Sequence, residues 1–184
     1  KLFVNPGLRG DGEVEVKRRI LGIDFFSGSL ADAVVSACHG GLCVAPSGPG
    51  LADDLVKCSF YSRALTQADL VLPDSGLMCL WSRLLSGKPI KRISGLAFLR
   101  AYLLDKNVSL ADAFWIMPDH DQSKANRQWI QKELGALIQP EAYCVAPTYP
   151  KTGPLEDAEL LAAIEKRRPK TIFIQIGGGV QERL

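Results

Sequence analysis

The sequence has few of the residues that build metal and redox sites. Only two histidines occur among its 184 residues, and they lie far apart, at His39 and His120. The one acidic cluster with a histidine is 119–121, where adjacent side chains point in different directions, so we expect no metal site. The five cysteines form no C-x-x-C pair, and their odd number argues against a disulfide framework. We therefore expect reduced, mostly buried thiols.

Long apolar runs and a strong charge of one sign are also missing. No apolar segment approaches the roughly 20 residues that a membrane-spanning helix needs. Residues 1–6 are too polar to begin a signal peptide. The net charge of +2 creates no overall attraction for nucleic acid. These absences predict a cytoplasmic protein with no nucleic-acid partner.

Several well-known catalytic and nucleotide-binding motifs do not occur. There is no G-x-x-x-x-G-K-[ST] phosphate loop, no G-x-G-x-x-G dinucleotide fingerprint and no G-x-S-x-G nucleophile elbow. The sequence therefore disfavours P-loop, dinucleotide-dependent and serine-hydrolase chemistry.

What is present is an alternation of short apolar strands with helical segments. Strands are expected at 19–26, 42–45, 69–72, 113–117, 142–146 and 171–176. Helices are expected at 29–38 (capped by Ser29), 51–66 (broken near 58–59), 77–85, 96–104, 121–134 (capped by Asp121 or Ser123) and 157–167. This order predicts an α/β fold, a Rossmann-like and mostly parallel sheet with helices on both faces. We expect one domain over residues 1–184, with 1–16 forming a loose N-terminal arm.

Four distinctive loops follow four of the predicted strands. They cover residues 45–49, 73–76, 146–150 and 177–182. In an open parallel sheet, ligands bind where the carboxyl ends of the strands meet. The loops are therefore predicted to surround one site.

Two of these loops carry the strongest candidates for chemistry. Asp74 follows an apolar strand at the mouth of the expected cleft, where partial burial suits a general base; the alternative is that Asp74 or Ser75 caps the next helix. The glycines at 177–179 allow close approach to a phosphate before a helix, or simply form a tight turn.

Three further groups have two interpretations each. Arg92 is suited to pairing with a diphosphate, or to an exposed salt bridge. Tyr149 is suited to stacking on a base, or to packing against its flanking prolines. The polar residues 181–183 are placed to hydrogen-bond a nucleotide, or to lie in solvent.

The 77–85 helix carries an apolar stripe. It consists of Leu77, Met78, Leu80, Trp81, Leu84 and Leu85. Such a stripe more often packs into a core than against lipid, so we expect it to be buried.

Four blocks of the sequence, in order, resemble the WecG/TagA/CpsF glycosyltransferase family, glycosyltransferase family 26. Residues 64–76, ending A-D-L-V-L-P-D-S-G, are similar to the family's A-D-L-v-l-P-D-G-x-G. Residues 85–95 resemble l-x-G-x-p-x-x-R-v-x-G, and residues 168–182 resemble x-P-D-i-l-x-v-x-l-G-x-P-x-Q-E. The I-L-G-I at 20–23 is similar to the family's i-l-G-v.

The resemblance implies an inverting, metal-independent enzyme without a cofactor. It would move an N-acetylmannosamine-like sugar from a UDP-sugar to a polyprenyl-diphosphate-linked sugar in bacterial cell-surface polysaccharide synthesis. Carried over, Asp74 is the general base and Arg92 contacts the donor diphosphate. The further substrate-binding residues are Ser47, Thr148, Tyr149, Gly177, Gly178, Gln181 and Glu182. The lipid-linked acceptor implies a cytoplasmic enzyme, peripheral at the inner face of the plasma membrane. The oligomeric state, monomer or homo-oligomer, stays open at this point.

The sequence also departs from the family pattern. Ser47 is the only hydroxyl where the family has a T-x-N-P loop, and Ser75 replaces the glycine of D-G. The sequence ends at Leu184, so we expect the family's C-terminal segment, which helps close the site, to be absent. These departures leave two alternatives open: a non-catalytic nucleotide-binding module and a Rossmann-like sugar-nucleotide oxidoreductase.

Overall fold

The computed structural model describes residues 2–5, 17–87, 89–150 and 153–184. A six-stranded sheet has the strand order β5-β4-β1-β8-β6-β7. Its strands are β1 (Leu2–Asn5), β4 (Gly41–Val44), β5 (Leu70–Val71), β6 (Ala113–Met117), β7 (Tyr143–Val145) and β8 (Thr171–Ile174). All run in one direction except β1, which is antiparallel to both β4 and β8. The prediction of a mostly parallel sheet is confirmed.

The N-terminal residues do not all form the arm that the sequence predicts. Leu2–Asn5 is β1, a central strand paired with β4 on one side and β8 on the other. Leu, Phe and Val favour a pleated strand, but the signal is too short to stand out in a glycine-rich neighbourhood. Residues 6–16 of the expected arm lie outside the described residues.

The predicted strand at 19–26 is a hairpin instead. Strands β2 (Lys17–Ile20) and β3 (Ile23–Phe26) pair in antiparallel fashion. The chain reverses at Leu21 and Gly22, whose φ angles are 53° and 80°. Two consecutive positive φ angles are typical of the tight hairpin turn whose twist matches its strands.

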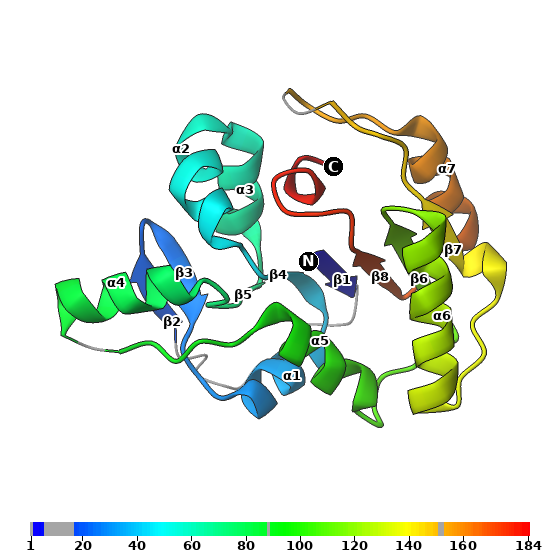
Figure 1. Ribbon diagram of the computed structural model, residues 1–184, viewed down its shortest axis with the longest axis horizontal. Coiled ribbons are helices and arrows are strands. Elements are labelled where there is room, and N and C mark those ends of the chain that lie inside the picture. Colours follow the sequence, from blue (N-terminus) through cyan, green and yellow to red (C-terminus); the bar gives the residue numbers. More distant parts are fainter. Residues whose placement is uncertain (1, 6–16, 88, 151–152) are drawn as a thin grey trace.

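Helices cover both faces of the sheet, as predicted (Figure 1). One face packs against α1 (Leu30–Cys38), α5 (Gly95–Leu104) and α6 (His120–Leu134). The other packs against α3 (Ser59–Gln67) at one end and α7 (Ala158–Arg167) at the other. The buried strand β6 packs on both faces. Trp115 belongs to the core beneath α1, α5 and α6, and Ile116 belongs to the core beneath α7.

Local signals fix several helix starts. Ser29 caps α1 in a reciprocal capping box with Asp32, as its position predicts. The cap of α6 is Asp119, which accepts from the Gln122 N–H, and not Asp121 or Ser123. The predicted 51–66 helix is broken at Cys58, as expected, into η1 (Gly50–Asp54), α2 (Leu55–Lys57) and α3. Two short 3₁₀ turns, η2 (Pro140–Ala142) and η3 (Gln181–Arg183), complete the elements.

Helix α4 (Gly76–Ser86) corrects one expectation. Met78, Cys79 and Ser82 are buried, and Met78 and Cys79 pack in the core cluster that includes Ile23 and Phe25 of the hairpin. The rest of the predicted core stripe faces outward, namely Leu77, Leu80, Trp81, Leu84 and Leu85. The prediction of burial is wrong for these five because α4 contacts the body along only one side.

The cysteines are free thiols, with Cys43 and Cys79 buried and the other three partly buried. Within the described ranges, no helix is both long enough and apolar enough to cross a bilayer.

Candidate functional site

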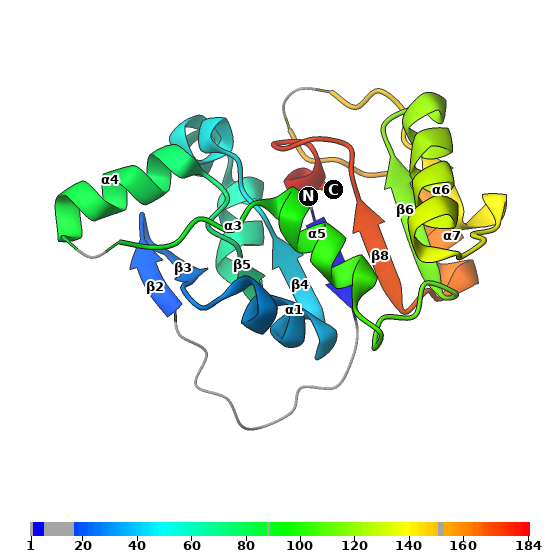
Figure 2. The same cartoon turned by 60° about the horizontal axis from the view of Figure 1, so that its bottom comes forward.

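Three of the four predicted loops meet at the carboxyl ends of the parallel strands. Figure 2 shows β4, β6 and β8 pointing toward the same edge, with the segment after β8 lying there. A Cβ atom placed on Gly178 would lie 3.4 Å from Ser47 Oγ. One placed on Gly48 would lie 3.2 Å from Ser75 Oγ. The loop after β4 therefore contacts both the loop after β5 and the glycine turn after β8.

The fourth loop is attached to this group by Arg183. This side chain is only 6% exposed. Its Nε donates to the Gly179 carbonyl at 2.7 Å, while Nη1 and Nη2 donate to the Gly153 and Pro150 carbonyls at 2.8 Å. The buried guanidinium is hydrogen-bonded to three main-chain carbonyls. It thereby joins the glycine turn to the end of the 146–150 loop. The predicted convergence of the four loops is thus present in the structure.

Asp74 lies at this junction and is held by Arg92. Arg92 Nε donates to the Asp74 main-chain oxygen at 2.6 Å, and Nη2 donates to Oδ1 at 3.0 Å. The side chain of Asp74 is 25% exposed and that of Arg92 is 57% exposed. The guanidinium therefore fixes both the backbone and the carboxylate of Asp74, while leaving the pair open to ligands.

The Asp74 carboxylate is not used to cap the following helix and stays partly exposed. Ser75, and not Asp74, caps α4 by accepting from the Met78 N–H at 3.2 Å. The second oxygen, Oδ2, lies beside the first residue of α5, since a Cβ atom on Gly95 would be 3.1 Å from it. The same Cβ atom would be 2.8 Å from the Ala45 Cβ atom. A glycine is thus required where α5 begins, so that the loop after β4, Asp74 and α5 can pack together.

The glycine turn differs from the phosphate cradle that the sequence suggests. The Gly179 N–H donates to Glu182 Oε2 at 2.6 Å, and Asp54 Oδ2 would lie 2.9 Å from a Cβ atom on Gly179. Within the described residues, the element that follows the turn is the three-residue η3. With two carboxylates beside Gly179, any anion contact falls to Gly177 and Gly178.

Gln181 and Glu182 are buried, at 1% and 7% exposure. Gln181 Nε2 donates to Glu182 Oε1 at 3.0 Å, and η3 packs against α3. Neither side chain lies in solvent, and both shape the turn in this conformation. Their predicted contact with substrate stays a prediction.

Tyr149 is engaged by other residues of the protein through both its ring and its hydroxyl. Its ring is partly buried against the core that includes Ile116 and Leu160. Its hydroxyl donates to Asp157 Oδ2 at 2.6 Å. Burial and this bond raise the pKa of Tyr149, while the same bond and the Leu160 N–H lower the pKa of Asp157. Thr148 is exposed.

Sequence reasoning missed four residues of this region. They are Asp54, Gly95, Asp157 and the structural role of Arg183. The only signal for Gly95 is its position after the predicted arginine, in R-I-S-G. The other three depend on which segments the fold brings together, which no local pattern shows.

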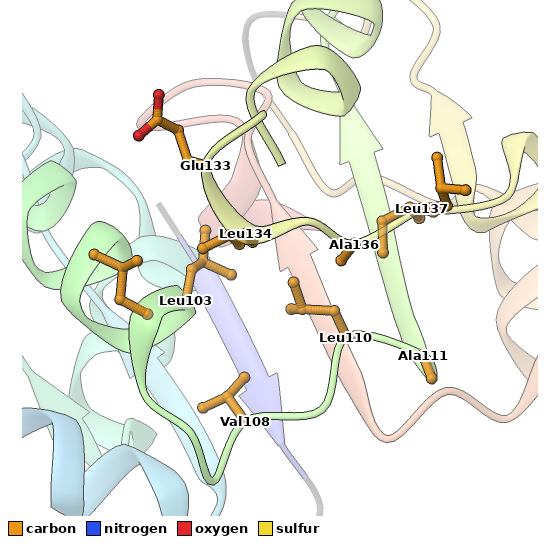
Figure 3. Close-up of a pocket in the computed structure, with 10 residues that line it drawn as sticks. Leu103, Val108, Leu110, Ala111, Glu133, Leu134, Ala136 and Leu137 are labelled. Atoms are coloured by element: carbon orange, nitrogen blue, oxygen red, sulfur yellow. The ribbon is translucent and has the colours of Figure 1, made fainter. Parts of the chain in front are cut away.

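An apolar pocket lies elsewhere in the protein. It has a volume of about 490 Å³ and is lined by Leu103, Leu104, Val108, Leu110, Ala111, Glu133, Leu134, Ala136, Leu137 and Ile138. Figure 3 shows these side chains near the start of β6, at the end of α5 and past the end of α6. This is the opposite edge of the sheet from Asp74.

Across the described part of the chain, no three His, Cys, Asp or Glu side chains are grouped so that they could hold a metal ion.

The sequence matches the family model described as "Glycosyl transferase WecG/TagA/CpsF family" over residues 18–184. No significant match to a curated protein was found.

Proposed function

Because the chain belongs to the WecG/TagA/CpsF family of glycosyl transferases, we propose that it transfers an N-acetylmannosamine-like sugar from a UDP-sugar to a polyprenyl-diphosphate-linked sugar. The family makes the chain a glycosyltransferase of cell-surface polysaccharide synthesis, with a sugar-nucleotide donor and a lipid-linked acceptor. The identity of the sugar, the inversion, the independence from metal ions and the residue roles below are the proposal.

The observation that carries the proposal is the Asp74 carboxylate at the junction of the loops. It is partly exposed, and Arg92 binds Oδ1 but not Oδ2. In the proposed step, Oδ2 accepts the proton of the acceptor hydroxyl while that oxygen bonds to the anomeric carbon. The bond from that carbon to UDP breaks on the opposite face, and UDP leaves with the electron pair. The configuration at the anomeric carbon therefore inverts.

Arg92 is proposed to stabilise the departing diphosphate. A guanidinium has five N–H donors, and Asp74 uses one on Nε and one on Nη2. The remaining donors suit an oxygen-rich ligand at the exposed side of the group. The same side chain thus orients the base and contacts the leaving group.

The donor site is proposed to lie between the loops. Ser47, Thr148, Gly177 and Gly178 would line it. Tyr149, Gln181 and Glu182 would shape it, because the hydroxyl of Tyr149 is bonded to Asp157 and the other two side chains are buried. The lipid-linked acceptor would keep the enzyme peripheral at the inner face of the plasma membrane.

Isothermal calorimetry combined with a panel of UDP-sugars tests the proposal on the whole chain. We expect UDP to bind equally with and without EDTA, and one UDP-sugar to be consumed when a lipid-diphosphate acceptor is present. Binding of NAD without UDP would favour the oxidoreductase. Binding of UDP with no sugar transfer would favour the non-catalytic module.

A further inference from the structure

Helix α4 presents a continuous apolar face to solvent. Leu77 is 71% exposed, Leu80 and Trp81 are 53% exposed, and Leu84 and Leu85 are 70% exposed. Residues at these three-, four- and seven-residue spacings lie on one side of a helix. Figures 1 and 2 both show α4 projecting from the sheet beyond the β2–β3 hairpin. Single exposed leucines are ordinary on protein surfaces, whereas a contiguous patch marks an interaction site.

The sequence segment that contains α4 carries charges of one sign. Between Asp74 and Asp105 the sequence has five basic residues and no acidic one. Four of them are exposed side chains in the described part, namely Arg83, Lys91, Arg92 and Arg100. Arg83 belongs to α4 itself, next to the apolar face. A helix with leucines and a tryptophan on one side and flanking cations is suited to the interface of an anionic bilayer.

We propose that α4 is the surface by which the protein docks on an anionic membrane. Leu77, Leu80, Trp81, Leu84 and Leu85 enter the boundary between headgroups and acyl chains. Arg83 and Lys91 lie among the lipid phosphates, while Arg92 stays on Asp74. The tryptophan ring suits this boundary because it is amphipathic. The catalytic advantage of this docking rests on the proposed function. Helix α4 starts two residues after Asp74, so docking would place the proposed base beside a lipid-linked acceptor.

The charge distribution favours a membrane over a second copy of the chain. A symmetric dimer through α4 would bring the same positive segment of both copies together. A bilayer containing anionic lipid instead supplies the opposite charge over the whole surface.

The test is sedimentation of the whole chain with vesicles of phosphatidylcholine alone or mixed with phosphatidylglycerol. We expect binding to the mixed vesicles that weakens as salt is raised. The double variant Leu80→Gln/Leu84→Gln should lower the partition constant by about tenfold or more, since two apolar side chains are lost from the inserted face. Matched controls are Leu137→Gln and Leu161→Gln, exposed leucines at 75% and 57% outside α4; these should bind normally. Circular dichroism checks that each variant is folded.

Tryptophan fluorescence gives an independent readout. Of the three tryptophans, Trp115 is fully buried and Trp129 is partly buried against the core, so neither should respond. The emission of Trp81 should shift to shorter wavelength on insertion. The shift should vanish in Trp81→Phe.

Each result decides between named alternatives. Equal vesicle binding by the double variant and the wild type would overturn α4 as the docking surface. Equal binding to both vesicle types would overturn the role of the cations. Self-association that the double variant abolishes, without vesicle binding, would show a contact between copies instead. UDP-sugar turnover with a short, water-soluble acceptor is measured separately: its absence while vesicle binding persists would remove the proposed function and leave the docking surface.

Discussion

Arg92 donates two hydrogen bonds to Asp74, from Nε to the main-chain oxygen at 2.6 Å and from Nη2 to the carboxylate at 3.0 Å. The two residues are 18 positions apart and come from the loops before α4 and before α5. The chain between them is α4 and the turn after it. The proposed base, the proposed diphosphate contact and the proposed membrane helix therefore form one connected unit.

Replacement of Asp74 by Asn tests the general base. The amide keeps an oxygen that can accept from Arg92 but cannot take up the acceptor proton. Turnover should fall by about 10²–10⁴-fold, with UDP affinity nearly unchanged in calorimetry. Asp112→Asn is the control, since Asp112 pairs with Lys170 at the opposite edge of the sheet and should keep full activity. Normal turnover by a folded Asp74→Asn protein would exclude the role.

Replacement of Arg92 tests the diphosphate contact. Arg92→Lys keeps the positive charge but loses the planar fork that binds Asp74 twice. We expect UDP affinity to drop and turnover to fall with it, with Arg92→Ala more severe than Arg92→Lys. Lys91→Ala, a change of the exposed neighbour, should have little effect. If Arg92→Ala binds UDP as tightly as the wild type, Arg92 does not contact the diphosphate.

Gly95→Ala tests the packing behind the base. The new Cβ atom would lie 2.8 Å from that of Ala45 and 3.1 Å from Asp74 Oδ2. Overpacking of this kind typically costs about 1–3 kcal/mol, and displacement of the carboxylate should lower activity as well. Gly76→Ala is the matched control at a helix start, because its Cβ atom would be 3.8 Å from Arg92 Cδ, an ordinary contact. Urea unfolding compares the two; equal stability would show that the region around Gly95 adjusts freely.

Asp157, which caps α7, should make the free energy of unfolding depend on pH in the acidic range. Hydrogen bonds from Tyr149 and the Leu160 N–H lower the pKa of Asp157 in the folded protein. Its contribution is therefore complete above the unfolded pKa of about 3.9 and is lost as the pH falls through the lower, folded pKa. Asp157→Ala should cost about 1 kcal/mol at neutral pH and less near pH 3. Thermal melts at both pH values, with the exposed neighbour Glu156→Ala as control, would detect the difference; a pH-independent cost would contradict it.

Much of the fold could be predicted because its signals are local. Strand β6 is an unbroken apolar run between polar turns, and Ser29 caps α1 through its own i+3 neighbour. Strand β1 was missed because only four residues form it, and they are strands only through pairing with distant β4 and β8. Helix α4 was assigned to the core because a helical stripe shows which residues share a face, not whether another element covers it.

The candidate site divides in the same way. The meeting of the loops follows from the direction of the strands, so it could be predicted from their order. The burial of Gln181 and Glu182 could not, because it depends on contact between η3 and α3 from far apart in the sequence. Nor does any local pattern place the Asp54 carboxylate beside Gly179.

The central position of β1 has a practical consequence. In the described sheet, β4 and β5 are connected to β8, β6 and β7 by main-chain hydrogen bonds only through Leu2–Asn5. The proposed site spans β1, with Asp74 on the side of β4 and β5 and the glycine turn on the side of β8. The matched family region begins at residue 18 and leaves this strand out. An expression clone that starts at the family boundary would thus lack β1, the strand that holds the two groups of strands in one sheet.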